Sequence, residues 1–310
     1  MALAAERKNG SERRTGAVEQ SCGGASEFEG IAATLIFNPH AGAGGVAPES
    51  LQDMLVDAGY RPSYRATEHA EELDGILKES EGLIVVAGGD GTFREVALRT
   101  AGSDRPIALL PLGTANNSAR TLGIEGPIRQ VVAGLRSPRK LAVDLLRARG
   151  PWGEELVVEG AGLGLYANVL AAYRPQDGKS LLRAILAAAS TLDADTAVRC
   201  RVELDGERLD GEYLLVEGMN MRAIGPRLTL APVADPTDGL LDLVLVRHEK
   251  RDALLAYVRG LMTSGLAELP SVELVQGKTV KVNWRGSAFH VDGNLCDEVS
   301  AGATRGFSAQ

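Results

Sequence analysis

The 310-residue chain has few aromatic side chains, few cysteines and no long apolar run, and each shortage excludes a class of protein. Phe, Trp and Tyr together make up only 4% of the chain, which argues against a base-stacking surface for single-stranded nucleic acid. A net charge of -8 also argues against nucleic-acid binding, because nucleic-acid-binding proteins are usually basic. No stretch reaches the roughly 18 apolar residues needed to span a bilayer.

The cysteines favour an intracellular protein. Cys22, Cys200 and Cys296 are far apart, odd in number and without metal-ligand spacing, which suits a reducing cytoplasm. The N-terminus also lacks the apolar segment of a secretory signal. We therefore expect a cytoplasmic protein, and the acidic balance leaves open a peripheral contact with the inner face of the membrane.

Composition along the chain predicts four segments. Residues 1–28 are polar, rich in Gly and Ser and without periodicity, which indicates a disordered leader. Residues 29–140 alternate short apolar strands with amphipathic helices, which predicts an α/β domain with a doubly wound parallel sheet. Residues 141–300 are mostly strand-like, which predicts a mainly antiparallel, sandwich-like β domain, and residues 301–310 are expected to form a tail.

Hydrophobic periodicity also predicts the individual elements. In the first domain we expect strands at 31–37, 60–66, 84–87 and 107–111 and helices at 48–58, 70–79 and 92–99, with one more around Val131 and Leu135. In the second we expect helices at 180–192 and 252–262, a hairpin turn at Asp205-Gly206, and strands at 141–149, 155–159, 198–204, 213–217, 240–247, 279–284 and 288–291.

The most informative stretch is Gly88-Gly89-Asp90-Gly91-Thr92-Phe93-Arg94-Glu95, which follows the apolar run 84–87. Thr92 and Glu95 fit a capping box that opens a helix. A strand, a glycine turn and a helix expose backbone N–H groups to an anion such as phosphate. A carboxylate at Asp90 suits a metal ion or the proton of a substrate hydroxyl. Alone, the motif also fits an ordinary tight turn.

Two other glycine-rich stretches follow predicted strands. Asn38-Pro39-His40-Ala41-Gly42 comes after the strand at 31–37, and Pro111-Leu112-Gly113-Thr114-Ala115-Asn116 ends the strand at 107–111. Ligands of open parallel sheets bind outside the carboxyl ends of the strands. We therefore expect all three stretches to converge on one cleft.

Together these three motifs resemble the diacylglycerol kinase catalytic family, which includes the bacterial lipid kinases and the sphingosine and ceramide kinases. The resemblance covers most of residues 31–295. It implies phosphoryl transfer from ATP, with Mg²⁺, to a lipid hydroxyl at a membrane surface, and leaves a homodimer open. The nucleotide-binding residues that it implies are Asn38, Pro39, His40, Ala41, Gly42, Thr67, Gly88, Gly89, Asp90, Gly91, Thr92, Phe93, Arg94, Glu95, Gly113, Thr114 and Asn116.

In the second domain the resemblance implies a metal site and a catalytic acid. Asp238, with the backbone carbonyls of Asp235 and Leu240, would hold a structural Mg²⁺, although the same residues also fit an Asp-Gly turn before a buried strand. Asp292-Gly293-Asn294 stands where the family usually has Asp-Gly-Glu, and an amide cannot take up a proton near neutral pH. Asp292 first, and Asp90 second, are therefore the expected general bases.

Further departures from the family pattern keep two rival functions open. Asn117-Ser118 replaces the usual Asp-Phe, and residues 224–227 stand where the family is commonly rich in glycine. An NAD kinase shares Gly-Gly-Asp-Gly-Thr but differs at the stretch 113–117. With Asn294 in place of an acid, the chain also fits a non-catalytic regulator that binds nucleotide. The sequence does not name the lipid.

Overall fold

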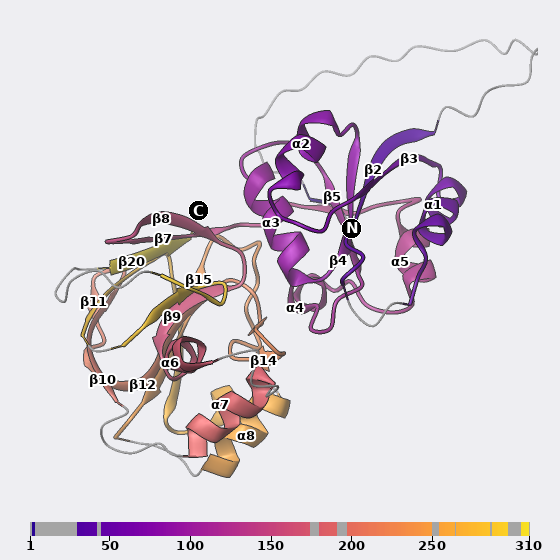
Figure 1. Ribbon diagram of the computed structural model, residues 1–310. Helices are drawn as coiled ribbons and strands as arrows, with labels where there is room; N and C mark the ends of the chain where they lie inside the picture. The colour runs from indigo at the N-terminus through magenta and orange to yellow at the C-terminus, as the bar shows by residue number, and fades with distance from the viewer. Residues whose placement is uncertain are drawn as a thin grey trace, which may run out of the picture. The chain divides into compact units, whose positions relative to one another are not determined.

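The computed structural model describes residues 2–3, 30–41, 45–173, 180–190, 197–249, 254–263, 265–285, 287–296 and 305–309. The chain divides into two compact units (Figure 1). The first comprises Met1–Leu112 and Glu125–Ala142, and the second comprises Gly113–Ile124 and Val143–Gln310. The predicted leader lies outside the described residues except at 2–3. The third glycine-rich stretch belongs to the second unit from Gly113 onward.

The first unit is built on the predicted parallel sheet. Its strands follow the order β3 (Tyr60–Ala66), β2 (Ile31–Phe37), β4 (Leu83–Gly88) and β5 (Ile107–Pro111), and each neighbouring pair is parallel. Every residue of β4 is buried, as a short β-branched run in the middle of a parallel sheet requires. Beyond β5 the order continues with β1 (Ala2–Leu3) and β6 (Lys140–Leu141).

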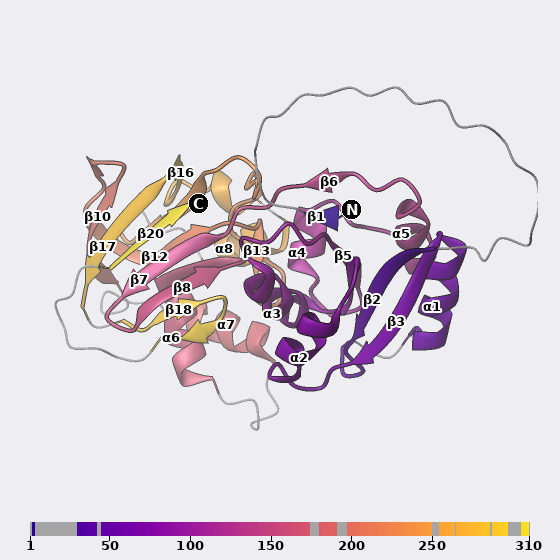
Figure 2. The same cartoon turned by 90° about the horizontal axis from the view of Figure 1, so that it is seen from above.

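Helices cover both faces of this sheet (Figures 1 and 2). α1 (Pro48–Asp57) and α5 (Ile128–Gly134) lie on one face, and α2 (Glu72–Glu79) and α3 (Asp90–Thr100) lie on the other. The predicted helices therefore form, with ends shifted by one or two residues. This doubly wound arrangement confirms the predicted α/β fold class and brings the carboxyl ends of β2 and β4 to the same edge.

The predicted capping box was wrong. α3 begins at Asp90 with Gly89 as its N-cap, and no side chain caps it. Thr92 lies in the first turn, and its hydroxyl accepts a hydrogen bond from the Asn38 amide nitrogen (3.0 Å) instead of capping the helix. The absence of a side chain at Gly88 permits this, because a Cβ there would lie 2.8 Å from Thr92 Oγ1.

The second unit is the predicted antiparallel β domain, a 12-stranded sheet in the described part of the chain. The main path runs β19-β18-β9-β12-β10-β17-β20-β7-β8, and each neighbouring pair along it is antiparallel. Its strands are β7 (Leu146–Gly150), β8 (Gly153–Val157), β9 (Gly160–Gly164), β10 (Val198–Leu204), β11 (Glu207–Arg208), β12 (Gly211–Met219), β15 (Leu241–Arg247), β16 (Val272–Gly277), β17 (Thr279–Trp284), β18 (Phe289–Val291), β19 (Asn294–Leu295) and β20 (Arg305–Ala309).

Several short elements complete the second unit. Asp205 and Gly206 both have positive φ (49° and 94°), which is the geometry of the predicted hairpin turn between β10 and β11. The predicted strand at 141–149 is interrupted at 142–145, where the Asp144 N–H donates to the Pro236 carbonyl (2.7 Å). The remaining elements are α4 (Asn117–Thr121), α6 (Leu165–Ala172), α7 (Leu181–Ser190), α8 (Leu254–Thr263), the 3₁₀ helix η3 (Leu266–Glu268), β13 (Ala223–Ile224) and β14 (Leu228–Thr229).

Among the described residues, every helix is too short or too polar to cross a bilayer.

Candidate functional site

The candidate site of the first unit is the N-terminus of α3. The buried strand β4 ends at Gly88, and the chain enters the helix through Gly89 without a side-chain cap. The first N–H groups of a helix have no acceptor within it and carry the positive end of the helix dipole. Gly91 is exposed, and a Cβ placed there would meet nothing within 4 Å. This turn can therefore receive a phosphate against its backbone.

Asn38 joins the first glycine-rich stretch to this turn. Its N–H donates to the Ala87 carbonyl (3.1 Å), and its side-chain Nδ2 donates to Thr92 Oγ1 (3.0 Å). Its Oδ1 accepts the His40 N–H (2.9 Å), and its carbonyl accepts the Ala41 N–H (3.1 Å). The structure thus brings together the ends of β2 and β4. The predicted residue Gly42 lies outside the described residues.

We expect Asn38→Ala to cost about 1–2 kcal/mol of unfolding free energy and to raise the KM for nucleotide several-fold, because it removes the bond that joins the two turns. Chemical denaturation and a nucleotide titration measure both effects. Thr92→Val removes the other end of the same bond, so its effect should not add to that of Asn38→Ala. Full additivity in the double variant would show that the two side chains act separately.

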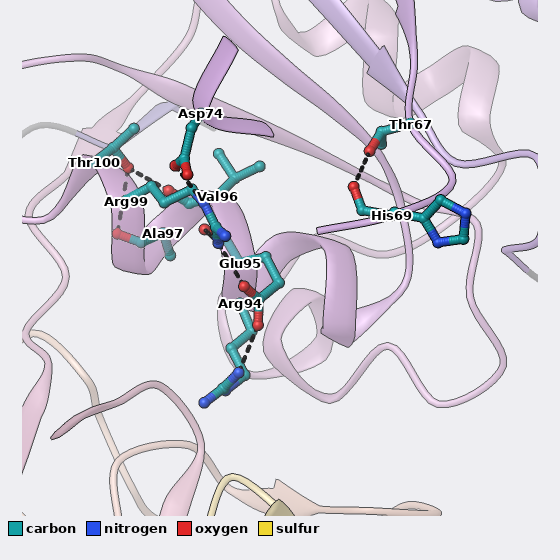
Figure 3. Close-up of polar contacts among 9 residues, drawn as sticks. All are labelled: Thr67, His69, Asp74, Arg94, Glu95, Val96, Ala97, Arg99 and Thr100. Carbon is teal, nitrogen blue, oxygen red and sulfur yellow. Dashed lines mark hydrogen bonds and ion pairs between the residues drawn. The ribbon is translucent and has the colours of Figure 1, made fainter. Parts of the chain in front are cut away.

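Other predicted nucleotide-binding residues of the first unit make local contacts (Figure 3). The Glu95 carboxylate lies 2.6 Å from Arg94 Nη1 and 2.5 Å from Arg99 Nη1, and Arg99 Nε donates to Asp74 Oδ1 (2.8 Å). The hydrogen bond to Glu95, with smaller effects of Asp74, raises the pKa of the Arg99 guanidinium further. Glu95 therefore bridges two arginines along α3.

Three more of the predicted residues also have local roles. The Thr67 hydroxyl donates to the His69 carbonyl (3.0 Å), so it fixes the end of β3 (Figure 3). Phe93 is 1% exposed and belongs to the core. His40 is exposed and lies 3.8 Å from the Glu68 carboxylate. These residues shape the loops, and their nucleotide contacts stay predictions.

The second unit has candidate residues of its own, beginning with the loop at Gly113. Asn116 has a left-handed backbone (φ 52°), and its Nδ2 donates to the Gly113 carbonyl (2.7 Å). Arg227 donates from Nε to the Ala115 carbonyl (3.1 Å) and from Nη2 to the Thr114 carbonyl. Sequence reasoning did not identify Arg227 as part of the site, although it singled out the unusual segment 224–227. Arg227 holds this loop in place.

Asp292 fixes the link between β8 and β9 in this unit. Its Oδ2 accepts the Val158 N–H (2.9 Å), and its Oδ1 accepts the N–H groups of Glu159 (2.7 Å) and Gly160 (3.1 Å). Its own N–H donates to the Gly160 carbonyl (2.8 Å), and its backbone is left-handed (φ 47°). Both carboxylate oxygens therefore hold the link between β8 and β9. Asn294 is exposed at the start of β19.

A buried acid–imidazole pair lies next to this turn. Glu217 and His290 are both 0% exposed, and His290 Nε2 lies 2.9 Å from Oε1 and 3.2 Å from Oε2, with hydrogen-bond geometry to Oε2. The Gly293 N–H donates to His290 Nδ1 (3.2 Å), which places the imidazole proton on Nε2. Burial raises the pKa of Glu217, and His290 lowers it less strongly.

The strand register explains how these two side chains meet. Glu217 of β12 and His290 of β18 both pair with Gly162 of β9, which lies between them. A Cβ on Gly162 would lie 2.3 Å from Glu217 Oε2, so only glycine leaves room for the pair. Tyr166 covers the imidazole with its ring edge-on at 4.8 Å between ring centroids. None of these residues was predicted, because single acids and histidines in apolar strands carry no local signal.

The predicted metal residues lie in a turn before β15. Asp238 Oδ1 accepts the Leu240 N–H (2.9 Å), and the Asp235 carbonyl accepts the Asp238 N–H (3.3 Å). Asp235 Oδ1 accepts from the N–H and hydroxyl of Thr237 (3.0 and 2.7 Å). Within the ranges that the structure describes, no three Asp, Glu, His or Cys side chains converge on one point. A cation here would need backbone carbonyls and water as further ligands.

The surroundings of this turn nevertheless suit a cation. Burial raises the pKa of Asp242 to about 6, and the charges of Asp238 and Asp235 add to the increase. Burial likewise raises the pKa of Asp144, whose Oδ2 accepts the Gly239 N–H (2.8 Å). Asp242 Oδ1 is buried and lacks a hydrogen-bond partner. The donors are all oxygen atoms of the kind Mg²⁺ prefers, so the residues fit this ion.

Comparisons with known proteins match two family models to successive parts of the chain. Residues 32–148 match the model of the diacylglycerol kinase catalytic domain, and residues 161–304 match that of the YegS C-terminal NAD kinase beta sandwich-like domain. A protein of Pseudomonas putida named "Probable lipid kinase YegS-like" is 30% identical over 244 residues, which are 75% of this chain and 80% of the relative.

Two further similarities concern proteins named diacylglycerol kinase. One, from Mycobacterium tuberculosis, is 28% identical over 217 residues, which are 68% of this chain and 70% of that protein. The other is a crystal structure of a diacylglycerol kinase from Bacillus anthracis str. Sterne, which superimposes with a TM-score of 0.63 and 18% identity. The match covers 90% of this chain and 94% of that one, and it shows that the two share a fold.

Proposed function

The chain belongs to the family of the diacylglycerol kinases and YegS-like lipid kinases, phosphotransferases with an alcohol acceptor, and from this premise we propose that it transfers the γ-phosphate of ATP to a lipid hydroxyl. The observation that carries the proposal is the uncapped N-terminus of α3, which Asn38 ties to the loop after β2. This is a cradle for phosphate, and it lacks the lysine of the ordinary phosphate-binding loop.

The first unit would bind and orient the nucleotide. Backbone N–H groups of Gly89–Thr92 would face the phosphates, and Asp90 stands at the first position of α3. Mg²⁺, when bound, would offset the phosphate charge. Asp238, with the backbone carbonyls of Asp235 and Leu240, is proposed to hold a structural ion. No general acid is needed for ADP as the leaving group.

The second unit would supply the acceptor side of the reaction. It holds the carboxylates around the Asp292 turn and the loop that Arg227 anchors. A lipid acceptor implies that the protein works at a membrane surface, in peripheral contact with it. The proton of the acceptor hydroxyl must pass to a base as its oxygen attacks phosphorus, and a carboxylate of this unit is the proposed acceptor.

The test is transfer of labelled γ-phosphate from ATP into a total lipid extract in mixed micelles with Mg²⁺. We expect a labelled lipid, and Asp90→Ala should lower its formation by a factor of about 100 or more, because a carboxylate at this turn would hold the metal ion of the nucleotide or take up the proton of the acceptor hydroxyl. The matched control is Asp104→Ala, since Asp104 is exposed and lies in the turn after α3. Identification of the labelled product would name the acceptor lipid.

Two other outcomes would contradict the proposal. Label that enters NAD but no lipid would make the protein an NAD kinase. Tight ATP binding without transfer to any acceptor would favour the nucleotide-binding regulator. An equal loss in Asp90→Ala and Asp104→Ala would show that the variants fail for reasons of folding.

A further inference from the structure

The amide at Asn294 leaves the position of the family's acid without a carboxylate, while an unassigned acid, Glu159, lies in the link between β8 and β9, which Asp292 holds. We propose that Glu159 is the general base of this protein and accepts the proton of the acceptor hydroxyl. This inference rests on the proposed phosphoryl transfer. It differs from the assignment to Asp292 or Asp90 that the sequence suggests.

The backbone of Glu159 is fixed from both sides. The residue stands in the short link between β8 and β9, and its N–H donates to Asp292 Oδ1 (2.7 Å). Its carbonyl accepts the N–H groups of Asn220 (2.9 Å) and Met221 (3.0 Å). A side chain on a backbone held in this way starts from a defined position, which proton transfer requires.

The Glu159 carboxylate connects the two motifs of this unit. Its Oε1 accepts a hydrogen bond from Asn117 Nδ2 (3.3 Å), and Asn117 also donates to the Gly225 carbonyl (2.9 Å). Glu159 is 8% exposed and Asn117 is 2% exposed. The acid therefore lies against both the glycine loop and the Asp292 turn, at the edge of the buried region.

The side-chain amides of Asn117 and Asn294 stand where the family usually has acids, and their neutrality suits a single carboxylate at Glu159. An Asp at position 117, as in the family, would place a second negative charge at hydrogen-bond distance from Glu159. Asn117 donates to the carboxylate instead, and Asn294 adds no charge to the same turn. An acid at 159 thus stands beside amides at 117 and 294, the two positions where the family usually has acids.

The other nearby carboxylates, those of Asp292 and Glu217, make contacts that hold the fold. Burial raises the pKa of the Tyr166 hydroxyl, and the charges of Glu217, Glu159 and Asp292 raise it further. All three acids therefore lie near this hydroxyl. A proton placed on either oxygen of Asp292 would displace a backbone N–H donor, because each oxygen already accepts at least one. Glu217 is 0% exposed and pairs with His290. Glu159 is 8% exposed, and its Oε1 accepts a hydrogen bond from the side-chain amide of Asn117 (3.3 Å).

In the proposed step the lipid hydroxyl oxygen forms a bond to the γ-phosphorus of ATP. The bond from that phosphorus to the β–γ bridging oxygen breaks, and ADP leaves with its electron pair. The hydroxyl proton passes to the Glu159 carboxylate, which later releases it to solvent. The products are a phosphorylated lipid, ADP and one proton.

The test compares Glu159→Gln with the matched control Glu155→Gln, which lies four residues earlier on the partly buried strand β8. We expect Glu159→Gln to lower kcat by a factor of about 100 to 10,000 and to leave the KM for ATP within about twofold. The control should retain wild-type turnover. The acidic limb of the wild-type pH profile should disappear from the residual activity of Glu159→Gln, because the titrating base is gone.

Rescue separates a catalytic role from a structural one. Asn294→Glu returns a carboxylate to the same turn, and in the Glu159→Gln background it should restore turnover at least tenfold. An exposed side chain at 294 cannot repair a folding defect, so rescue supports the proposal even where Glu159→Gln lowers the Tm. Turnover of Glu159→Gln within about threefold of the control, or loss without rescue, overturns the proposal and leaves the kinase function standing. A wild-type protein without phosphoryl transfer overturns both.

Discussion

Asp292→Ala is expected to lower the free energy of unfolding by about 3–5 kcal/mol and to reduce phosphoryl transfer by a factor of 100 or more. The carboxylate accepts three backbone N–H groups, from Val158, Glu159 and Gly160. Alanine would leave these donors without their acceptor, and it tolerates the left-handed backbone at 292 (φ 47°) less well than aspartate. Chemical denaturation and steady-state kinetics measure the two effects.

Asp292→Asn is the informative companion variant. Its amide keeps one oxygen acceptor and the left-handed backbone preference, so we expect about half of the stability loss of the alanine variant. If Asp292 positions Glu159 through the 2.7 Å bond to its N–H, the asparagine variant should keep a measurable kcat and the acidic limb of the pH profile. Wild-type stability in Asp292→Ala would show that the three N–H bonds contribute little.

Local sequence patterns were enough to predict most elements of the first unit. The strands at Tyr60–Ala66 and Ile107–Pro111 and the helix beginning at Pro48 were predicted at or near their observed bounds. Periodicity works here because each strand is a short apolar run between turn residues and each helix buries one face. The parallel order follows from the alternation of these elements. The hairpin turn at Asp205 was predicted from its two residues alone.

The capping box failed because a distant residue changes the role of Thr92. A hydroxyl followed three residues later by glutamate ordinarily marks a helix start. Here Asn38, 54 residues earlier in the chain, donates to that hydroxyl, and Glu95 is held by Arg94 and Arg99. The helix therefore begins two residues earlier, where glycine serves as its cap. Local rules fail where a side chain has a tertiary partner.

Glu159 and Glu217 of the second unit were not predicted from the sequence, for a similar reason. Glu159 was assigned to the end of a strand, but β8 ends at Val157 and leaves Glu159 in the link before β9. Glu217 and His290 are 73 residues apart and meet only because β12 and β18 both pair with Gly162. Strand order and register decide which buried polar residues become neighbours, and neither can be read from one strand alone.

The second large expected effect concerns this buried pair. His290→Leu should cost about 3–5 kcal/mol of unfolding free energy at neutral pH, because it leaves the Glu217 carboxylate buried without its partner. The cost should be smaller in acid. Burial raises the pKa of Glu217 above 4.5, and removal of His290 removes the influence that lowers it.

The sign of the pH dependence follows from proton binding. An acid with a raised pKa in the folded state binds its proton more tightly there than in the unfolded chain, so stability falls as pH rises from 4.5 through the folded-state value. The deficit of His290→Leu relative to wild type should therefore grow from pH 4 to pH 7. Denaturation of both proteins across this range tests the expectation. A deficit that does not change with pH would show that lost packing against Tyr166, rather than charge, is responsible.

Adding Glu217→Leu to His290→Leu separates two contributions to the lost stability. One is the free energy of burying the unpaired Glu217 carboxylate, and the other is that of removing the imidazole. The double variant removes both polar groups, so it should recover most of the stability lost at pH 7. It should not recover all of it, because the Gly293 N–H donates to His290 Nδ1 (3.2 Å) and loses this acceptor in both variants. The remaining deficit, independent of pH, then measures what the imidazole contributes to the Asp292-Gly293-Asn294 turn. Recovery to full wild-type stability would show that His290 does not hold that turn.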